Sequence, residues 1–111
     1  MEQNELLTSM VMELRRGTLV LSVLCSLDRP MYGYSLLSEL SGHGIPVETN
    51  TLYPLLRRLE SQGLLESEWN TEESKPRKYY KITQFGSEIR EKLKDYWRKT
   101  AESMSEIMGD Q

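Results

Sequence analysis

The chain has 111 residues, of which 38% are hydrophobic and 28% are charged, and its formal net charge is -3. This length predicts one domain, and this composition is typical of folded soluble proteins. No uninterrupted apolar run exceeds three residues, whereas a bilayer-spanning helix needs about 20. The acidic N-terminal segment 1–5 lacks the features of a secretory signal. We therefore expect a cytoplasmic protein.

Cys25 is the only cysteine and His43 the only histidine. An internal disulfide is excluded, and a zinc site built from one chain is not expected. We expect no metal and no cofactor. Cys25 lies on an apolar helix face, which favours a buried small side chain over a redox switch. His43 stands between two glycines, which favours a turn residue over a pH sensor.

The first half of the chain predicts two helical segments before the first proline. Apolar residues at helical spacing predict an N-terminal arm over 6–14, and Gly17 interrupts the pattern. The pattern resumes in a core helix over 18–27, which Pro30 ends. A short second helix follows over 32–40 and stops at the glycines around His43.

A third helix is predicted from leucines at positions i, i+3, i+4 and i+7, namely Leu52, Leu55, Leu56 and Leu59. Residues 48–50 supply candidate N-terminal caps. Pro54 falls near the second turn, so we expect the start of this helix to be distorted.

Two strand-like runs, 64–69 and 77–83, flank a polar loop and predict a hairpin with a long tip. We expect Trp69, on the first run, to belong to the core. The last helix begins after Thr83, a plausible N-cap. Its apolar stripe runs to Met108, and about 24 residues span roughly 36 Å. Because a globule of this size has a radius of gyration near 13 Å, the stripe should extend beyond its own domain and need a second chain.

The order helix, short helix, turn, helix, hairpin predicts a winged helix-turn-helix, mainly α with a small β-hairpin. We divide the chain into a DNA-binding domain with its helical arm, residues 1–83, and a C-terminal dimerisation helix, residues 84–111. The third helix has a second face opposite its leucines. That face consists of Asn50, Thr51, Tyr53, Pro54, Arg57 and Arg58. Small polar groups at the helix start and arginines further along suit entry into a major groove of double-stranded DNA.

The hairpin tip supplies Lys75, Arg77 and Lys78 as candidate phosphate contacts. Tyr34 and Ser35, at the start of the second helix, add candidate hydroxyl contacts. The negative net charge argues against nucleic-acid binding in general, but segment 74–81 carries four basic residues and no acidic one. Taken singly, the arginine pair and the basic loop are as easily explained as solvated surface. In this element order they favour DNA binding.

Several strings resemble the PadR family of bacterial transcriptional regulators, over nearly the whole chain. They are L-R-R-G-T-L at 14–19, Y-G-Y at 32–34, T-L-Y-P-L-L-R-R-L-E at 51–60, G-L-L at 63–65 and R-K-Y-Y-K-I-T at 77–83, with Gly86. The resemblance implies a winged-helix homodimer interlocked by its N- and C-terminal helices, and it makes Pro54 a family feature. Asn50 departs from the glycine of many relatives. The single C-terminal helix is similar to the short branch of the family.

The resemblance also implies a candidate effector site. Some short-form relatives hold flat aromatic compounds between two tryptophans at the position of Trp97. A two-fold axis would bring the two Trp97 rings face to face; the alternative is that Trp97 packs in the dimer core. The candidate effector-binding residues are Leu6, Met10, Leu14, Leu93, Tyr96 and Trp97.

The sequence therefore predicts a homodimeric DNA-binding repressor that reads an inverted repeat, with a small planar aromatic effector as the candidate ligand that releases it. The alternative is a winged-helix module that binds proteins and has no affinity for DNA. An enzyme is not expected, because no nucleophile–base pair, phosphate loop or metal set is visible.

Overall fold

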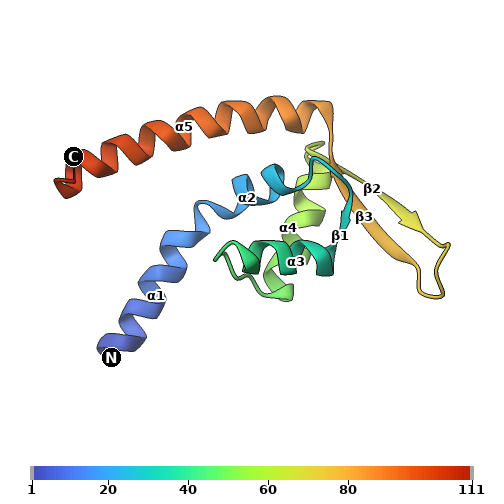
Figure 1. The fold of residues 1–111 in the computed structure, drawn as a ribbon, viewed down its shortest axis with the longest axis horizontal. Coiled ribbons are helices and arrows are strands. Elements are labelled where there is room, and N and C mark those ends of the chain that lie inside the picture. The colour runs from blue at the N-terminus through green and yellow to red at the C-terminus, as the bar shows by residue number, and fades with distance from the viewer. Residues whose placement is uncertain (1, 111) are drawn as a thin grey trace.

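Five helices and a small sheet make up residues 2–110, the part of the chain that the computed structural model describes (Figure 1). The helices are α1 (Gln3–Arg16), α2 (Leu19–Ser26), α3 (Gly33–Gly42), α4 (Thr49–Ser61) and α5 (Gln84–Met108). The strands are β1 (Met31–Tyr32), β2 (Leu65–Asn70) and β3 (Arg77–Ile82). The predicted order of helices and the hairpin are confirmed, as is a mainly helical fold. No helix in the described residues is long and apolar enough to cross a membrane.

The sheet has the order β1-β3-β2 and is antiparallel throughout. The β2–β3 hairpin, called the wing below, pairs from Leu65 opposite Ile82 to Asn70 opposite Arg77. The two-residue strand β1 adds a third partner, with Met31 opposite Tyr80. We did not predict β1, because two residues are too few to show a period of two. Figure 1 shows the wing leaving the helices and ending in a loop at one extremity of the molecule.

Leucines of the three central helices form the core. Leu52, Leu56 and Leu59 line the inner face of α4 at helical spacing and are at most 1% exposed. Other buried side chains around them are Val23, Leu24, Leu27, Leu36, Leu40, Leu65, Tyr80 and Ile82. Each such side chain stabilises the fold by roughly 1.5–3 kcal/mol through its removal from water. The central domain therefore has a complete core of its own.

The N-cap of α4 is one of the three expected residues, but its capping and the course of the helix at Pro54 differ from our expectation. Its N-cap is Glu48, whose side chain forms no capping hydrogen bond; instead, the backbone carbonyl of Glu48 accepts from the N–H groups of Thr51 and Leu52. Pro54 lies inside the helix, and α4 is helical from end to end. The bond that proline removes would have gone to the carbonyl of Asn50, an exposed residue in the first turn, where water can replace it.

Thr83 caps α5 as predicted. Its hydroxyl accepts a hydrogen bond from the Gly86 N–H at 2.9 Å and donates to the Gly63 carbonyl at 2.7 Å. Gly86 allows this close approach, because a Cβ built there would lie 2.1 Å from the Leu64 carbonyl oxygen. The start of α5 is thus fixed to the connection between α4 and β2.

Two predicted core residues lie at the surface of the chain. Trp69 is 62% exposed. It shares a face of β2 with the buried Leu65, but the wing has passed the edge of the core at this point. Cys25 is also exposed, because α2 turns Val23 and Leu24 inward and Cys25 away from them. Both predictions were wrong, since apolar character alone does not show where the core ends.

The helix α1 and the distal half of α5 lie outside this core. No residue of α1 is buried, and Figure 1 shows both helices diverging from α2 on the side opposite the wing. Their exposed apolar side chains are Leu6, Leu7, Met10, Met12, Leu14, Tyr96, Trp97, Met104, Ile107 and Met108. The expectation that α5 extends beyond its own domain is met over these residues.

Candidate nucleic-acid interface

The outer face of α4 is polar and open. Asn50, Thr51 and Pro54 are exposed near its N-terminus, and Arg57 and Arg58 are exposed one turn further along. Neither guanidinium forms an ion pair with a carboxylate in residues 2–110. These two charges are therefore free to contact an external anion, and the small side chains precede them as predicted.

Tyr53 is different, because its ring lies between two helices. A Cβ built on the buried Gly33 would stand 2.4 Å from the Tyr53 ring. Glycine at position 33 therefore lets the first turn of α3 lie directly against this side chain of α4. The Y-G-Y and T-L-Y-P strings therefore meet at the joint between the two helices. Tyr53 is half-buried as a result.

An aromatic cluster joins the start of α3 to the outer face of β3 in the wing. The Tyr32 ring stacks on Tyr34 with centroids 6.5 Å apart, and it meets Tyr79 edge-on at 5.6 Å. The guanidinium of Arg77 lies 4.4 Å from the centroid of Tyr32, within the range of a cation–π contact. The predicted site residues Tyr34 and Arg77 are thus brought together, and the sequence analysis missed Tyr32 and Tyr79, which position them.

The three basic residues predicted at the wing tip do not share one environment. Lys75 is exposed in the loop. Arg77 lies on the outer face of β3 and has the Glu73 carboxylate at 3.6 Å. Lys78 lies on the core-facing side with Tyr80 and Ile82. The alternation of side chains along a strand separates neighbours in this way, and this pattern was available in the sequence.

Lys78 contacts α4 and is only partly exposed to solvent. Its Nζ atom lies 3.5 Å from Oε1 of Glu60 and 5.3 Å from the centroid of the Tyr80 ring. Burial opposes the charge of the ammonium, but Tyr80 and Glu60 outweigh it, so the pKa of Lys78 is raised above its ordinary value. The other carboxylate oxygen of Glu60 accepts a hydrogen bond from the hydroxyl of Ser67. Glu60, Ser67 and Lys78 are called the Glu60 clasp below.

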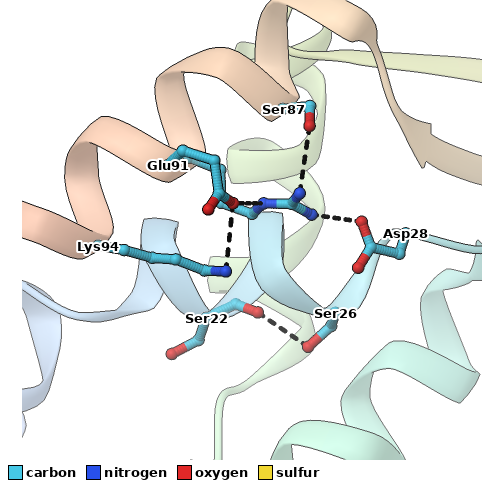
Figure 2. Close-up of polar contacts among 7 residues, drawn as sticks. Ser22, Ser26, Asp28, Ser87, Glu91 and Lys94 are labelled. Carbon is cyan, nitrogen blue, oxygen red and sulfur yellow. Dashed lines mark hydrogen bonds and ion pairs between the residues drawn. The ribbon is translucent and has the colours of Figure 1, made fainter.

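A second polar cluster fixes α5 to the end of α2 (Figure 2). The Arg90 guanidinium donates to the carboxylate of Asp28, to Glu91 at 2.9 Å and to the Ser87 hydroxyl at 3.1 Å. Hydrogen bonding to Asp28, foremost, raises the pKa of Arg90. Hydrogen bonds from Lys94, then Arg90, lower the pKa of Glu91. The direction in which α5 leaves the domain is therefore set in its first three turns.

The predicted effector-binding residues are not gathered into one pocket by the single chain. Leu6, Met10 and Leu14 are exposed on α1, and Tyr96 is exposed on α5. Trp97 is 49% exposed, and Leu93 packs partly against the core. Because α1 and the distal part of α5 diverge (Figure 1), the side chains of α1 would meet those of α5 only across an interface between two chains.

Similar proteins agree on one family. Residues 20–98 match the family model described as the transcriptional regulator PadR-like family. The transcriptional regulator Rv3488 of Mycobacterium tuberculosis is 39% identical over 84 residues, which are 76% of each chain. The crystal structure of a PadR family transcriptional regulator from Eggerthella lenta has 49% identity and a TM-score of 0.91, covering 97% of this chain and 96% of that one. A PadR-like regulator from Bacillus cereus has 29% identity and a TM-score of 0.79, covering 89% and 99%.

Proposed function

Because the chain belongs to the PadR-like family of transcriptional regulators, and is therefore a DNA-binding regulator and not an enzyme, we propose that it is a homodimeric repressor of an inverted repeat. The observation that carries this proposal is the open polar face of α4, with two guanidinium groups free of carboxylates in the described residues. Such a repressor acts in the cytoplasm, where a bacterial chromosome lies.

In this proposal α4 enters the major groove with its N-terminal half. Asn50 and Thr51 have short side chains, so the start of α4 can lie close to the bases and these two residues can contact base edges. Arg57 and Arg58 contact phosphates. Lys75 and Arg77 on the wing, with Tyr34 and Ser35 on α3, add backbone contacts. Tyr32 holds Arg77 at the outer end of β3, which supports a fixed position for that charge.

The exposed apolar faces of α1 and α5 support dimerisation. In this proposal residues 84–111, which contain α5, are the dimerisation segment, and residues 1–83 are the DNA-binding domain with its arm; positions 1 and 111 lie outside the described residues. The charges of the two helix ends are complementary: α1 ends in Arg15 and Arg16, whereas the end of α5 carries Glu102 and Glu106 and is followed by Asp110. Pairing of α1 with α5 of a second copy would cover both faces and match these charges. Two α4 helices about 34 Å apart would then read successive turns of DNA.

A mobility shift on the DNA upstream of the chain's own gene tests the role of α4. We expect Arg57→Ala to weaken binding and to lower the slope of log affinity against log salt by about 0.9 for each phosphate that the protein no longer neutralises. Arg98→Ala is the matched control, because Arg98 is an exposed arginine on α5 and should bind as the unaltered protein does. Unchanged binding by Arg57→Ala would contradict this role for α4. A complete lack of DNA binding at low salt would favour the protein-interaction module.

Sedimentation equilibrium tests the dimer. Leu14→Glu places a charge on the most exposed leucine of α1 and should convert the dimer to monomers, with loss of DNA binding. Glu13→Gln, at the neighbouring exposed position, should leave the dimer intact. A dimer that persists in Leu14→Glu would rule out pairing through this face.

We propose Trp97, with Leu6, Met10, Leu14, Leu93 and Tyr96, as the site of a planar aromatic effector. The half-exposed ring of Trp97 on an uncovered face supports this. The experiment uses Trp69→Phe, so that Trp97 is the only fluorescent tryptophan, and acridine orange as the flat probe. Quenching of Trp97 that saturates supports the site, and unchanged fluorescence removes it.

A further inference from the structure

The wing is held on a narrow base. Its inner end is anchored by Leu65, Tyr80 and Ile82, which are buried. Toward the tip, Trp69 is exposed, and the loop 71–76 is exposed throughout. The link from α4 to β2 is short and includes Gly63, whose φ is 80°. Because the wing is anchored at its inner end, its direction depends on side-chain contacts made between that end and the tip.

Two contacts of this kind lie on opposite faces of β3: Tyr32 contacts Tyr79 and Arg77 on the outer face, and the Glu60 clasp holds the core-facing side. Glu60 lies in the last turn of α4, Ser67 in the middle of β2 and Lys78 near the outer end of β3. The side chains of Lys78 and Glu60 are 31% and 32% exposed, so water screens this pair less than it screens an open surface pair. One carboxylate therefore links α4 to both strands of the wing.

Lys78 cannot contact a DNA phosphate without leaving the Glu60 clasp. Its ammonium would have to leave both the Glu60 carboxylate and the Tyr80 ring, and the strand directs its side chain toward α4 rather than outward. Lys75, by contrast, is exposed in the wing loop and pairs with no carboxylate in residues 2–110. The two lysines thus have different roles, although they are only three residues apart.

We propose that Glu60 is a positioning residue, which fixes the angle between α4 and the wing by holding Ser67 and Lys78, and that Lys78 is its partner rather than a phosphate contact. This inference rests on the proposed binding of DNA by α4 and the wing. A fixed angle lets both elements bind at once without ordering the wing during binding, and preorganisation of this kind raises affinity.

The first test compares two lysine variants by the salt dependence of DNA binding. Lys75→Gln should lower the slope of log affinity against log salt by about 0.9 per subunit, because it removes a phosphate contact. Lys78→Gln should weaken binding and leave that slope unchanged. A lower slope for Lys78→Gln, equal to that of Lys75→Gln, would show that Lys78 contacts phosphate and would overturn the proposal.

The second test uses Glu60→Gln, which keeps the shape of the side chain and removes its charge. We expect affinity to fall about tenfold at every salt concentration, with hydroxyl-radical protection absent where the wing binds and kept where α4 binds. In the free protein, amide exchange in β2 and β3 should quicken, while that in α2 and α3 is unchanged. Tighter binding by Glu60→Gln would mean that Glu60 merely masks Lys78, and would refute the clasp.

The exchanged pair Glu60→Lys with Lys78→Glu supplies the rescue. It restores an ion pair between the same positions at the same net charge, so wing protection should return. Continued absence of protection would contradict the clasp. If the unaltered protein binds no duplex, the proposed function itself fails. If it binds, and Arg57→Ala weakens binding while Glu60→Gln does not, only the clasp fails.

Discussion

The central domain and the two long helices contain similar apolar side chains but bury them very differently. In the central domain, α4 places Leu52, Leu56 and Leu59 where α2, α3 and the sheet cover them. In α1 and distal α5, leucine, isoleucine, methionine and tryptophan at the same helical spacing are 42–77% exposed. The spacing of apolar residues forms a helix with an apolar face in both regions. The neighbours of each helix decide whether its apolar face is buried within one chain or is left exposed for a second chain to cover.

The two regions are joined at a stiff junction. Arg90, which is only 12% exposed, binds Asp28 at the end of α2 (Figure 2), and Thr83 fixes the first turn of α5 to Gly63. Movement of α5 would therefore be transmitted to the domain that carries α4. The core of the central domain thus folds each chain, whereas α1 and α5 would set the distance between the two α4 helices of a dimer.

The largest expected effect is on the buried side of this comparison. Leu56→Ala removes a fully buried side chain and should lower the free energy of unfolding by about 2–5 kcal/mol, measured by urea denaturation. Leu14→Ala is the control, because Leu14 is 76% exposed in one chain. Its effect should appear only at protein concentrations where the dimer forms. An equal loss of stability in both variants at the lowest concentrations would mean that the two regions form one core.

A smaller effect is expected at the junction. Thr83→Ala removes the acceptor for the Gly86 N–H and the donor to the Gly63 carbonyl, and loss of such a cap costs about 0.5–2 kcal/mol. Thr100→Ala, at an exposed site inside α5, should be neutral or slightly stabilising, because alanine is the better helix former. Thermal unfolding of the two variants provides the measurement. A fall in Tm as large for Thr100→Ala would argue against a specific role for the cap.

The smallest effect concerns Cys25, which lies on α2 close to α5. Although Cys25 is exposed at the surface of the chain, partial burial of its thiol is the main influence on the pKa and raises it, while Lys94 and Arg90 oppose it. A raised pKa leaves less thiolate at a given pH, so at pH 8 the native protein should react with a disulfide reagent more slowly than the urea-unfolded chain. The rate should rise as the pH approaches the pKa. A native rate equal to the unfolded rate would show that α5 does not shield this side of α2.

Local patterns predicted the elements well because each depends on near neighbours. The leucine spacing of 52–59 defined α4 and its inner face, and Thr83 marked the start of α5. The same patterns failed where the outcome depends on the edge of the core, as with Trp69 and Cys25. They also missed β1, whose two residues are a strand only because β3 lies beside them. For the candidate site, the open face of α4 followed from periodicity, whereas the partners of Arg77 and Lys78 come from distant segments.

The sequence by itself determined the helices, the hairpin, the cap at Thr83 and the family, because spacing, capping and specific strings act over a few residues. Only the tertiary structure decided that Gly33 lies against the ring of Tyr53, and that Tyr32 holds Arg77 while Glu60 holds Lys78. The physical reason is the separation, along the sequence, of the residues that interact. Backbone hydrogen bonds and turns are set by neighbouring residues, but burial and charge pairing depend on segments that meet only after the chain has folded.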